Sequence, residues 1–75
     1  MKLKKCINLV EFLNIVNKCQ GEVIFETEEG DRLNIKTQLS KFFFITAGQD
    51  EKFLDLGEVI CSIKADEQIL AGFWL

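Results

Sequence analysis

Residues 22–36 alternate between apolar and polar positions, which is typical of a β-hairpin with one buried face. The apolar positions that would form this face are Val23, Phe25, Leu33 and Ile35. Ile24 is an exception, because it falls among charged residues on the opposite face. The pattern predicts strands at about 22–27 and 31–36, and it makes Ile24 a candidate contact with another surface.

A three-residue loop at positions 28–30 gives this hairpin its best register. It sets Phe25 against Leu33, and the other pairs that it aligns are Val23–Ile35, Glu26–Arg32 and Glu22–Lys36. Gly30 then takes the loop position that needs a positive φ in a type I turn followed by a G1 bulge. A two-residue loop would set Glu26 against Leu33 and lose both the apolar and the ionic matches.

A helical period precedes the hairpin. The apolar positions that repeat at helical spacing are Leu9, Phe12, Leu13, Val16 and Cys19. Asn8 is a suitable N-cap, and Glu11 three residues later completes a capping box. Gly21 supplies a stop signal. These signals predict a helix at residues 9–19.

Residues 37–48 fit two structures. Three consecutive phenylalanines and an isoleucine, 42–45, have strand propensity. However, Thr37 is a good N-cap, Ala47-Gly48 is a typical helix ending, and Leu39, Phe42 and Phe43 share one helical face. We predict a helix at about 38–47. Because 42–45 covers more than half a turn, this helix is expected either between two layers or partly in an interface.

The C-terminal part predicts a strand and a short helix. Residues 49–57 form a polar loop with room for a helical turn, and 58–64 form a strand with Val59, Cys61 and Ile63 on one side. Asp66 is expected to cap a helix at 67–73. The apolar ending Phe73-Trp74-Leu75 needs a surface to dock on. At the other end, residues 2–6 fit a short strand or an arm.

The expected order is therefore α-β-β-α-β-α in a single α+β domain, 1–75, with a three-stranded, mostly antiparallel sheet and helices on one face. Seven phenylalanines and 48% hydrophobic residues are more than a chain of 75 residues can hide. We expect the excess to contact a partner, either a second copy or another protein. The candidate interface residues are Ile24, Phe42, Phe43, Phe44, Ile45, Phe73, Trp74 and Leu75.

The charge does not suggest a general nucleic-acid binder, because the net charge is −3. Four of the nine basic residues but only one of the twelve acidic residues fall in the first twenty positions. Lys2, Lys4 and Lys5 are therefore weak candidates for contacting phosphates. Arg32 and Lys36 are expected to be neutralised by the glutamates across the hairpin.

The residue types argue against catalysis. The chain has no histidine, so the usual base of a Ser or Cys nucleophile is missing, and its three cysteines have no Cys-x-x-Cys spacing. The acidic pairs fall in turns and helix starts, where acids serve local structure. We therefore predict no enzyme, no cofactor and no metal site, although the acidic turn at 28–31 leaves ion binding open.

The cysteines also bear on location. Cys6, Cys19 and Cys61 are interpreted as small buried hydrophobes with reduced thiols, which predicts the cytoplasm. The opening lysines are not followed by the uninterrupted apolar stretch of a signal peptide. No run approaches the roughly 18 apolar residues of a membrane span.

The run Glu29-Gly-Asp-Arg-Leu-Asn-Ile-Lys-Thr-Gln-Leu-Ser-Lys-Phe42 resembles a signature of uncharacterised short proteins from gut Gram-positive bacteria that are associated with conjugative mobile elements. The resemblance extends to Asn8-Leu-Val-Glu-Phe-Leu13 and to the acidic final helix. The alternative to an interaction module is a small accessory or regulatory protein of a mobile element that would contact nucleic acid through Lys2, Lys4 and Lys5. Some members carry a poly(A) polymerase label, but this chain has neither the Gly-Ser loop nor the Asp-x-Asp pair of a nucleotidyltransferase. No activity can be transferred to particular residues.

Overall fold

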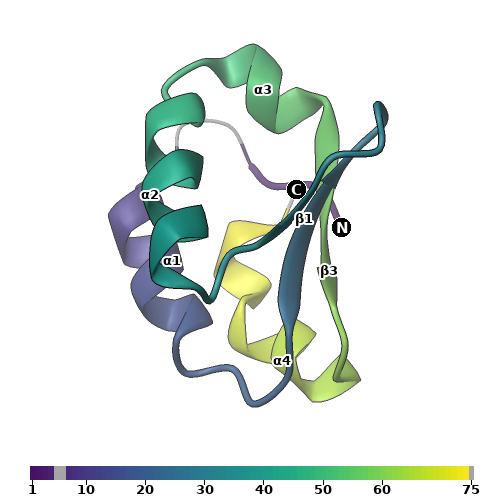
Figure 1. The fold of residues 1–75 in the computed structure, drawn as a ribbon. Helices are drawn as coiled ribbons and strands as arrows, with labels where there is room; N and C mark the ends of the chain where they lie inside the picture. The colour runs from purple at the N-terminus through teal and green to yellow at the C-terminus, as the bar shows by residue number, and fades with distance from the viewer. Residues whose placement is uncertain (5–6, 75) are drawn as a thin grey trace.

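The computed structural model describes residues 1–4 and 7–74 and consists of helices on one face of a three-stranded antiparallel sheet (Figure 1). The elements are α1 (Leu9–Val16), β1 (Val23–Thr27), β2 (Arg32–Asn34), α2 (Gln38–Ala47), α3 (Glu51–Asp55), β3 (Gly57–Cys61), α4 (Lys64–Ile69) and the 3-10 turn η1 (Ala71–Phe73). The sheet order is β2-β1-β3, and both pairings are antiparallel. The predicted α+β class and its arrangement are therefore confirmed.

The hairpin has the predicted register. Phe25 lies opposite Leu33, and Glu26 lies opposite Arg32, whose Nε is 3.0 Å from a Glu26 carboxylate oxygen. The amide of Thr27 donates to the carbonyl of Asp31 (2.9 Å), which closes the three-residue loop. Gly30 has a φ of 93°, the conformation that the G1 bulge requires.

The end of the hairpin differs from the prediction. β2 stops at Asn34, because the carbonyl of Asn34 accepts bonds from the amide (3.1 Å) and the hydroxyl (3.0 Å) of Thr37, which starts the turn into α2. The predicted ion pair between Glu22 and Lys36 is wrong. The Lys36 ammonium instead donates to the carbonyls of Cys19 (2.7 Å) and Gly21 (2.9 Å) and holds the α1–β1 connection.

The two faces of the sheet are sharply distinguished. Val23, Phe25 and Val59 point to the helices and are buried. Ile24 and Ile60, which pair across β1 and β3, lie on the opposite face, and Ile60 is exposed. No described element covers that face in Figure 1. Ile63 was expected on the buried side of the third strand, but β3 ends at Cys61 and Ile63 is exposed.

Helix α1 is shorter than the predicted 9–19. Its N-cap is Asn8, as expected, whose side chain accepts from the amide of Glu11 (3.0 Å). At the other end the amides of Lys18 and Cys19 bond to carbonyls three residues earlier, at 2.9 and 3.0 Å. The last turn therefore tightens and leaves the α-helical path after Val16.

Asp66 does not cap the final helix. Helix α4 starts after Ile63, so Asp66 is its third residue and is buried. Its carboxylate accepts from the amides of Gln20 (3.0 Å) and Gly21 (2.8 Å), far away in sequence. The acid therefore serves the α1–β1 connection, because that loop has amides without other partners.

Trp74 docks on other residues of the same chain. Trp74 is 9% exposed, pairs with Leu3 in an antiparallel bridge, and donates from its indole nitrogen to the carbonyl of Glu67 (2.9 Å). The hypothesis that Trp74 needs an external surface is therefore wrong. Lys5, Cys6 and Leu75 lie outside the described residues.

Candidate interaction surface

Helix α2 carries the surface of greatest interest, and the helix itself was predicted at the observed bounds. Thr37 is the N-cap, and its hydroxyl accepts from the amide of Ser40 (3.4 Å). Phe44 is fully buried, with its ring centroid 5.2 Å from that of Phe25 and 6.1 Å from that of Phe12. These contacts fix the rotation of α2 on the sheet. As a consequence, Phe44 cannot serve as an interface residue.

The opposite side of α2 is an exposed apolar ridge. Leu39, Phe42 and Phe43 are 83%, 74% and 53% exposed, and they lie at the i, i+3, i+4 positions of one helical face. Residues 42–45 are all apolar, and only one side of a helix can meet the core. Once Phe44 occupies that side, Phe42 and Phe43 must face outward. We call Leu39, Phe42 and Phe43 the α2 ridge.

A groove runs beside the ridge, between α1 and α2. The helices are antiparallel, because the start of α1 lies against the end of α2. They come close at Gly48, where an added Cβ would lie 2.6 Å from the Leu9 Cδ1 atom and 2.7 Å from the Phe44 carbonyl oxygen. Gly48 has a φ of −71°, so glycine serves close packing here and not a left-handed turn.

The part of this groove next to the ridge has a volume of about 270 Å³. The residues that line it are Val10, Leu13, Asn14, Asn17, Gln38, Lys41, Phe42 and Ile45. We call this hollow the α1–α2 groove. Its walls include the exposed Val10 and Phe42, and the ammonium of Lys41 bonds to the side-chain oxygen of Asn17 across it. The only charge on α2 is therefore engaged within the chain.

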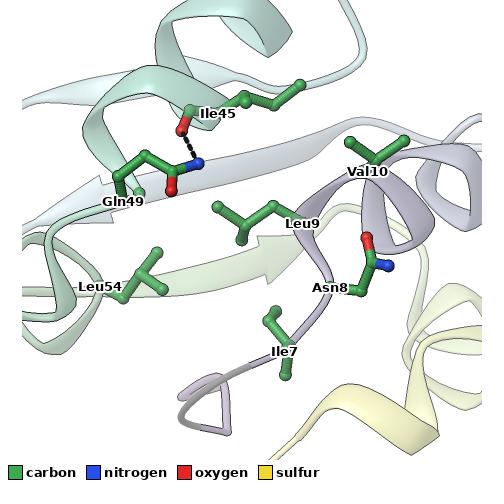
Figure 2. Close-up of a pocket in the computed structure, with 8 residues that line it drawn as sticks. Ile7, Asn8, Leu9, Val10, Ile45, Gln49 and Leu54 are labelled. Atoms are coloured by element: carbon green, nitrogen blue, oxygen red, sulfur yellow. Dashed lines mark hydrogen bonds between the residues drawn. The ribbon is translucent and has the colours of Figure 1, made fainter.

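A second hollow continues the seam past the start of α1 (Figure 2). It measures about 280 Å³ and shares Val10 and Ile45 with the α1–α2 groove. Figure 2 shows that Leu9 and Leu54 extend into it from two different helices. Gln49, which follows α2, donates from its side-chain amide to the carbonyl of Ile45 in that helix (3.3 Å). The hollow extends the groove with a lining of both polar and apolar groups, and none of the side chains in this lining is charged.

On the other side of the ridge lies a smaller hollow of about 210 Å³. Its apolar lining comes from Leu33, Phe43 and Phe53, and the Phe43 and Phe53 rings pack edge to face with centroids 6.2 Å apart. Its polar lining is Thr27, Asp31 and Arg32. The α2 ridge is thus flanked by hollows on both sides.

The remaining predicted interface residues are not brought together. Ile24 is half-buried on the open face of the sheet, beside Ile60. Ile45 is half-buried in the α1–α2 groove, and Phe73 is half-buried with its ring centroid 5.1 Å from that of Phe12. Trp74 is in the core.

Two residues of the surface were not among the predicted interface residues. Leu39 had been placed on the correct helical face, but it was not counted as an interface residue. Val10 falls on the outer side of α1, and only its position opposite Phe42 across the groove gives it a role. A helical wheel can find the first, whereas the second requires the packing of α1 against α2.

The two N-terminal lysines that the structure describes, Lys2 and Lys4, are not gathered into one basic patch. The ammonium of Lys2 donates to the carbonyl of Asp55 (2.8 Å), so this charge is held against the end of α3. Lys4 is exposed, and its backbone amide donates to the carbonyl of Phe73 (2.9 Å). The third member, Lys5, lies outside the described residues.

The described cysteines have weakly acidic thiols. Cys19 and Cys61 are free, and both pack in or against the hydrophobic core. Burial, followed by the negative charge of Asp66, raises the pKa of the Cys19 thiol. Burial, followed by the neighbouring Cys19, Glu67 and Asp66, raises the pKa of Cys61 to about 11. Neither thiol is activated as a nucleophile.

Among the side chains that the structure describes, no group of three or more His, Cys, Asp or Glu is arranged to hold a metal ion. Among the described helices, none is long and apolar enough to cross a membrane. Comparison with protein-family models, curated proteins and solved structures found no match. The resemblance to short proteins of mobile elements stays a prediction.

Proposed function

We propose that this protein is a non-enzymatic protein-interaction module that binds through the α2 ridge and the α1–α2 groove beside it. The observation that carries the proposal is the joint exposure of Leu39, Phe42 and Phe43 on a single helical face. Isolated exposed apolar residues are ordinary on protein surfaces. Three large ones in register on one helix are typical of a helix whose outer face meets a partner.

The composition of this surface supports the same proposal. Charged residues make up 28% of the chain, yet Lys41 is the only one in α2. The central part of protein interfaces is depleted in charge and enriched in aromatic residues. Helix α2 has both properties, because its exposed side presents two phenylalanines and a leucine.

The cysteines support a cytoplasmic location for this module. Cys19 and Cys61 are free, and reduced thiols are the normal state in that compartment. Their packing in or against the core gives them a structural role that needs no partner thiol.

The proposal can be tested by site-specific photocrosslinking in cells that produce the protein. A photoreactive phenylalanine analogue is placed at Phe42 on the ridge or, as a matched control, at Ile60 on the open face of the sheet. We expect specific protein adducts from position 42 that excess wild-type protein suppresses and excess Phe42→Glu protein does not. Equal adduct yields at the two positions would contradict the proposal.

A further inference from the structure

We infer that the occupant of this surface is a second copy of the chain, in a two-fold symmetric dimer in which Phe42 of each copy sits over the α1–α2 groove of the other. The inference rests on the proposed function and specifies the partner. It follows from the positions of the ridge and the groove, the charges around them, and the area that they offer.

The positions satisfy what a two-fold interface requires. In such an interface the same patch occurs on both copies and must complement itself. Phe42 belongs to the ridge and also forms a wall of the groove. A two-fold axis beside Phe42 therefore brings the two rings together and places each over the partner's groove. Phe42 and the groove lie side by side on one surface, so a single two-fold contact fills the grooves of both copies.

The size of the groove matches a side chain. At about 270 Å³ it lies below the usual range of small-molecule pockets, roughly 300–1,000 Å³. Its apolar walls, Val10 and Phe42, are exposed, and Leu13 is buried beneath them. A phenylalanine ring entering the groove would cover this apolar surface while the asparagines at the edge stay in contact with water.

The charges favour self-association at α2 over self-association at the open face of the sheet. On the open face of the sheet, Glu26 lies opposite Glu58 and is bonded to the Arg32 guanidinium, so two copies stacked face to face would have to remove these three charges from water. On α2 the only charge is Lys41, which already bonds to Asn17. The ridge residues Leu39, Phe42 and Phe43 carry no charge, so contact between two ridges removes no charged ridge side chain from water.

The area sets the expected strength. From their exposed fractions, the three ridge residues and Val10 offer roughly 400–500 Å² per copy. The total of about 1,000 Å² is at the lower limit for a specific interface. We therefore expect a weak dimer, with a dissociation constant on the order of 10–100 μM.

Sedimentation equilibrium between about 1 μM and about 1 mM, a range that brackets this affinity, tests the inference. The mean mass of the wild-type protein should rise from 8.6 kDa toward twice that value. Phe42→Glu changes the ridge, whereas Asn14→Trp fills the groove and leaves the ridge unchanged. Each should weaken dimerisation about tenfold or more. Ile60→Glu, an exposed apolar position on the sheet, should leave it unchanged.

The other outcomes separate this inference from the proposed function. A strict monomer throughout the range overturns the second copy as partner, whereas the crosslinking test of the ridge still stands. A dimer that is weakened by Phe42→Glu but not by Asn14→Trp overturns the seating in the groove and keeps the ridge as the binding surface. A dimer that only Ile60→Glu weakens overturns both proposals. Circular dichroism of each variant confirms that it is folded.

Discussion

Asp66 connects two regions that are more than forty residues apart. Its carboxylate, on α4, accepts the amides of Gln20 and Gly21 in the α1–β1 connection. Lys36 holds the same connection through two of its carbonyls. A buried acid and a lysine thus satisfy amides and carbonyls of the same loop, because the amides need an acceptor and the carbonyls need a donor.

Replacing Asp66 should destabilise the fold. Asp66→Ala leaves two amides without their acceptor, and we expect the free energy of unfolding to fall by about 2–3 kcal/mol. Asp66→Asn keeps one acceptor oxygen, so its free energy of unfolding should lie between those of the wild type and Asp66→Ala. Urea denaturation measures the effect, with Gln68→Ala on the exposed side of α4 as the control. If Asp66→Ala proves as stable as Gln68→Ala, the carboxylate does not hold the loop.

The raised pKa values of Cys19 and Cys61 predict that both thiols react slowly with thiol reagents. Cys61 titrates near 11 in the folded chain, against an ordinary value of 9.0, so its thiolate is about 100-fold scarcer at pH 8 than in the unfolded chain. In a Cys6→Ser background, Ellman's reagent should modify Cys61 slowly until the protein is denatured. The rate should rise with pH through about 11 and not level off above 9. Mass spectrometry identifies the modified site, and rapid modification at pH 8 would contradict a partly buried, neutral thiol.

At the scale of elements, α2 shows that neighbouring identical residues can have opposite roles. Phe42 and Phe44 are two positions apart, and a helix turns by about 200° over that distance. Phe44 is fully buried between Phe12 and Phe25, whereas Phe42 is 74% exposed. One side of the helix therefore stabilises the fold, and the other is available for binding.

A matched pair of substitutions separates these roles. Phe44→Ala removes a core ring and leaves a cavity, so the free energy of unfolding should fall by about 3–5 kcal/mol. Phe42→Ala should change the stability of the monomer by less than about 0.5 kcal/mol. Urea denaturation at about 1 μM keeps the protein largely monomeric for this comparison. Similar losses in both variants would show that α2 is rotated from its described position.

At the scale of the whole molecule, some large apolar side chains remain exposed outside the hydrophobic core. The chain hides Phe12, Phe25 and Phe44 in one aromatic core but leaves the α2 ridge outside. A chain of 75 residues has a high ratio of surface to volume, so its helices cannot be covered on every side. The proposed association would remove this surface from water and would add to the stability of a small domain.

Thermal unfolding should therefore depend on protein concentration. Because a partner that binds only the folded state stabilises it by mass action, the wild-type Tm should rise by several degrees between about 10 μM and about 1 mM. Phe42→Glu should have a Tm that does not change over the same range. Differential scanning calorimetry measures both. Equal concentration dependence in the two proteins would mean that the ridge does not mediate association.

Much of the fold could be predicted from residues that are close in sequence. The hairpin register follows from the apolar and charged pairs, with Gly30 at the positive φ of its loop. The caps Asn8 and Thr37 mark the starts of α1 and α2. These features depend on hydrogen bonds and turns between residues a few positions apart, so the local sequence by itself determines them.

The tertiary structure alone decided which apolar residues are available for binding. Residues 42–45 are apolar on nearly every side of α2, so their pattern contains no preferred buried face. The choice is made by Phe12 and Phe25, which come from other elements and enclose Phe44. In the same way, Trp74 finds its surface on Leu3 and Glu67. Burial is a relation between distant segments, and for that reason the sequence determined the elements and the packing determined the candidate site.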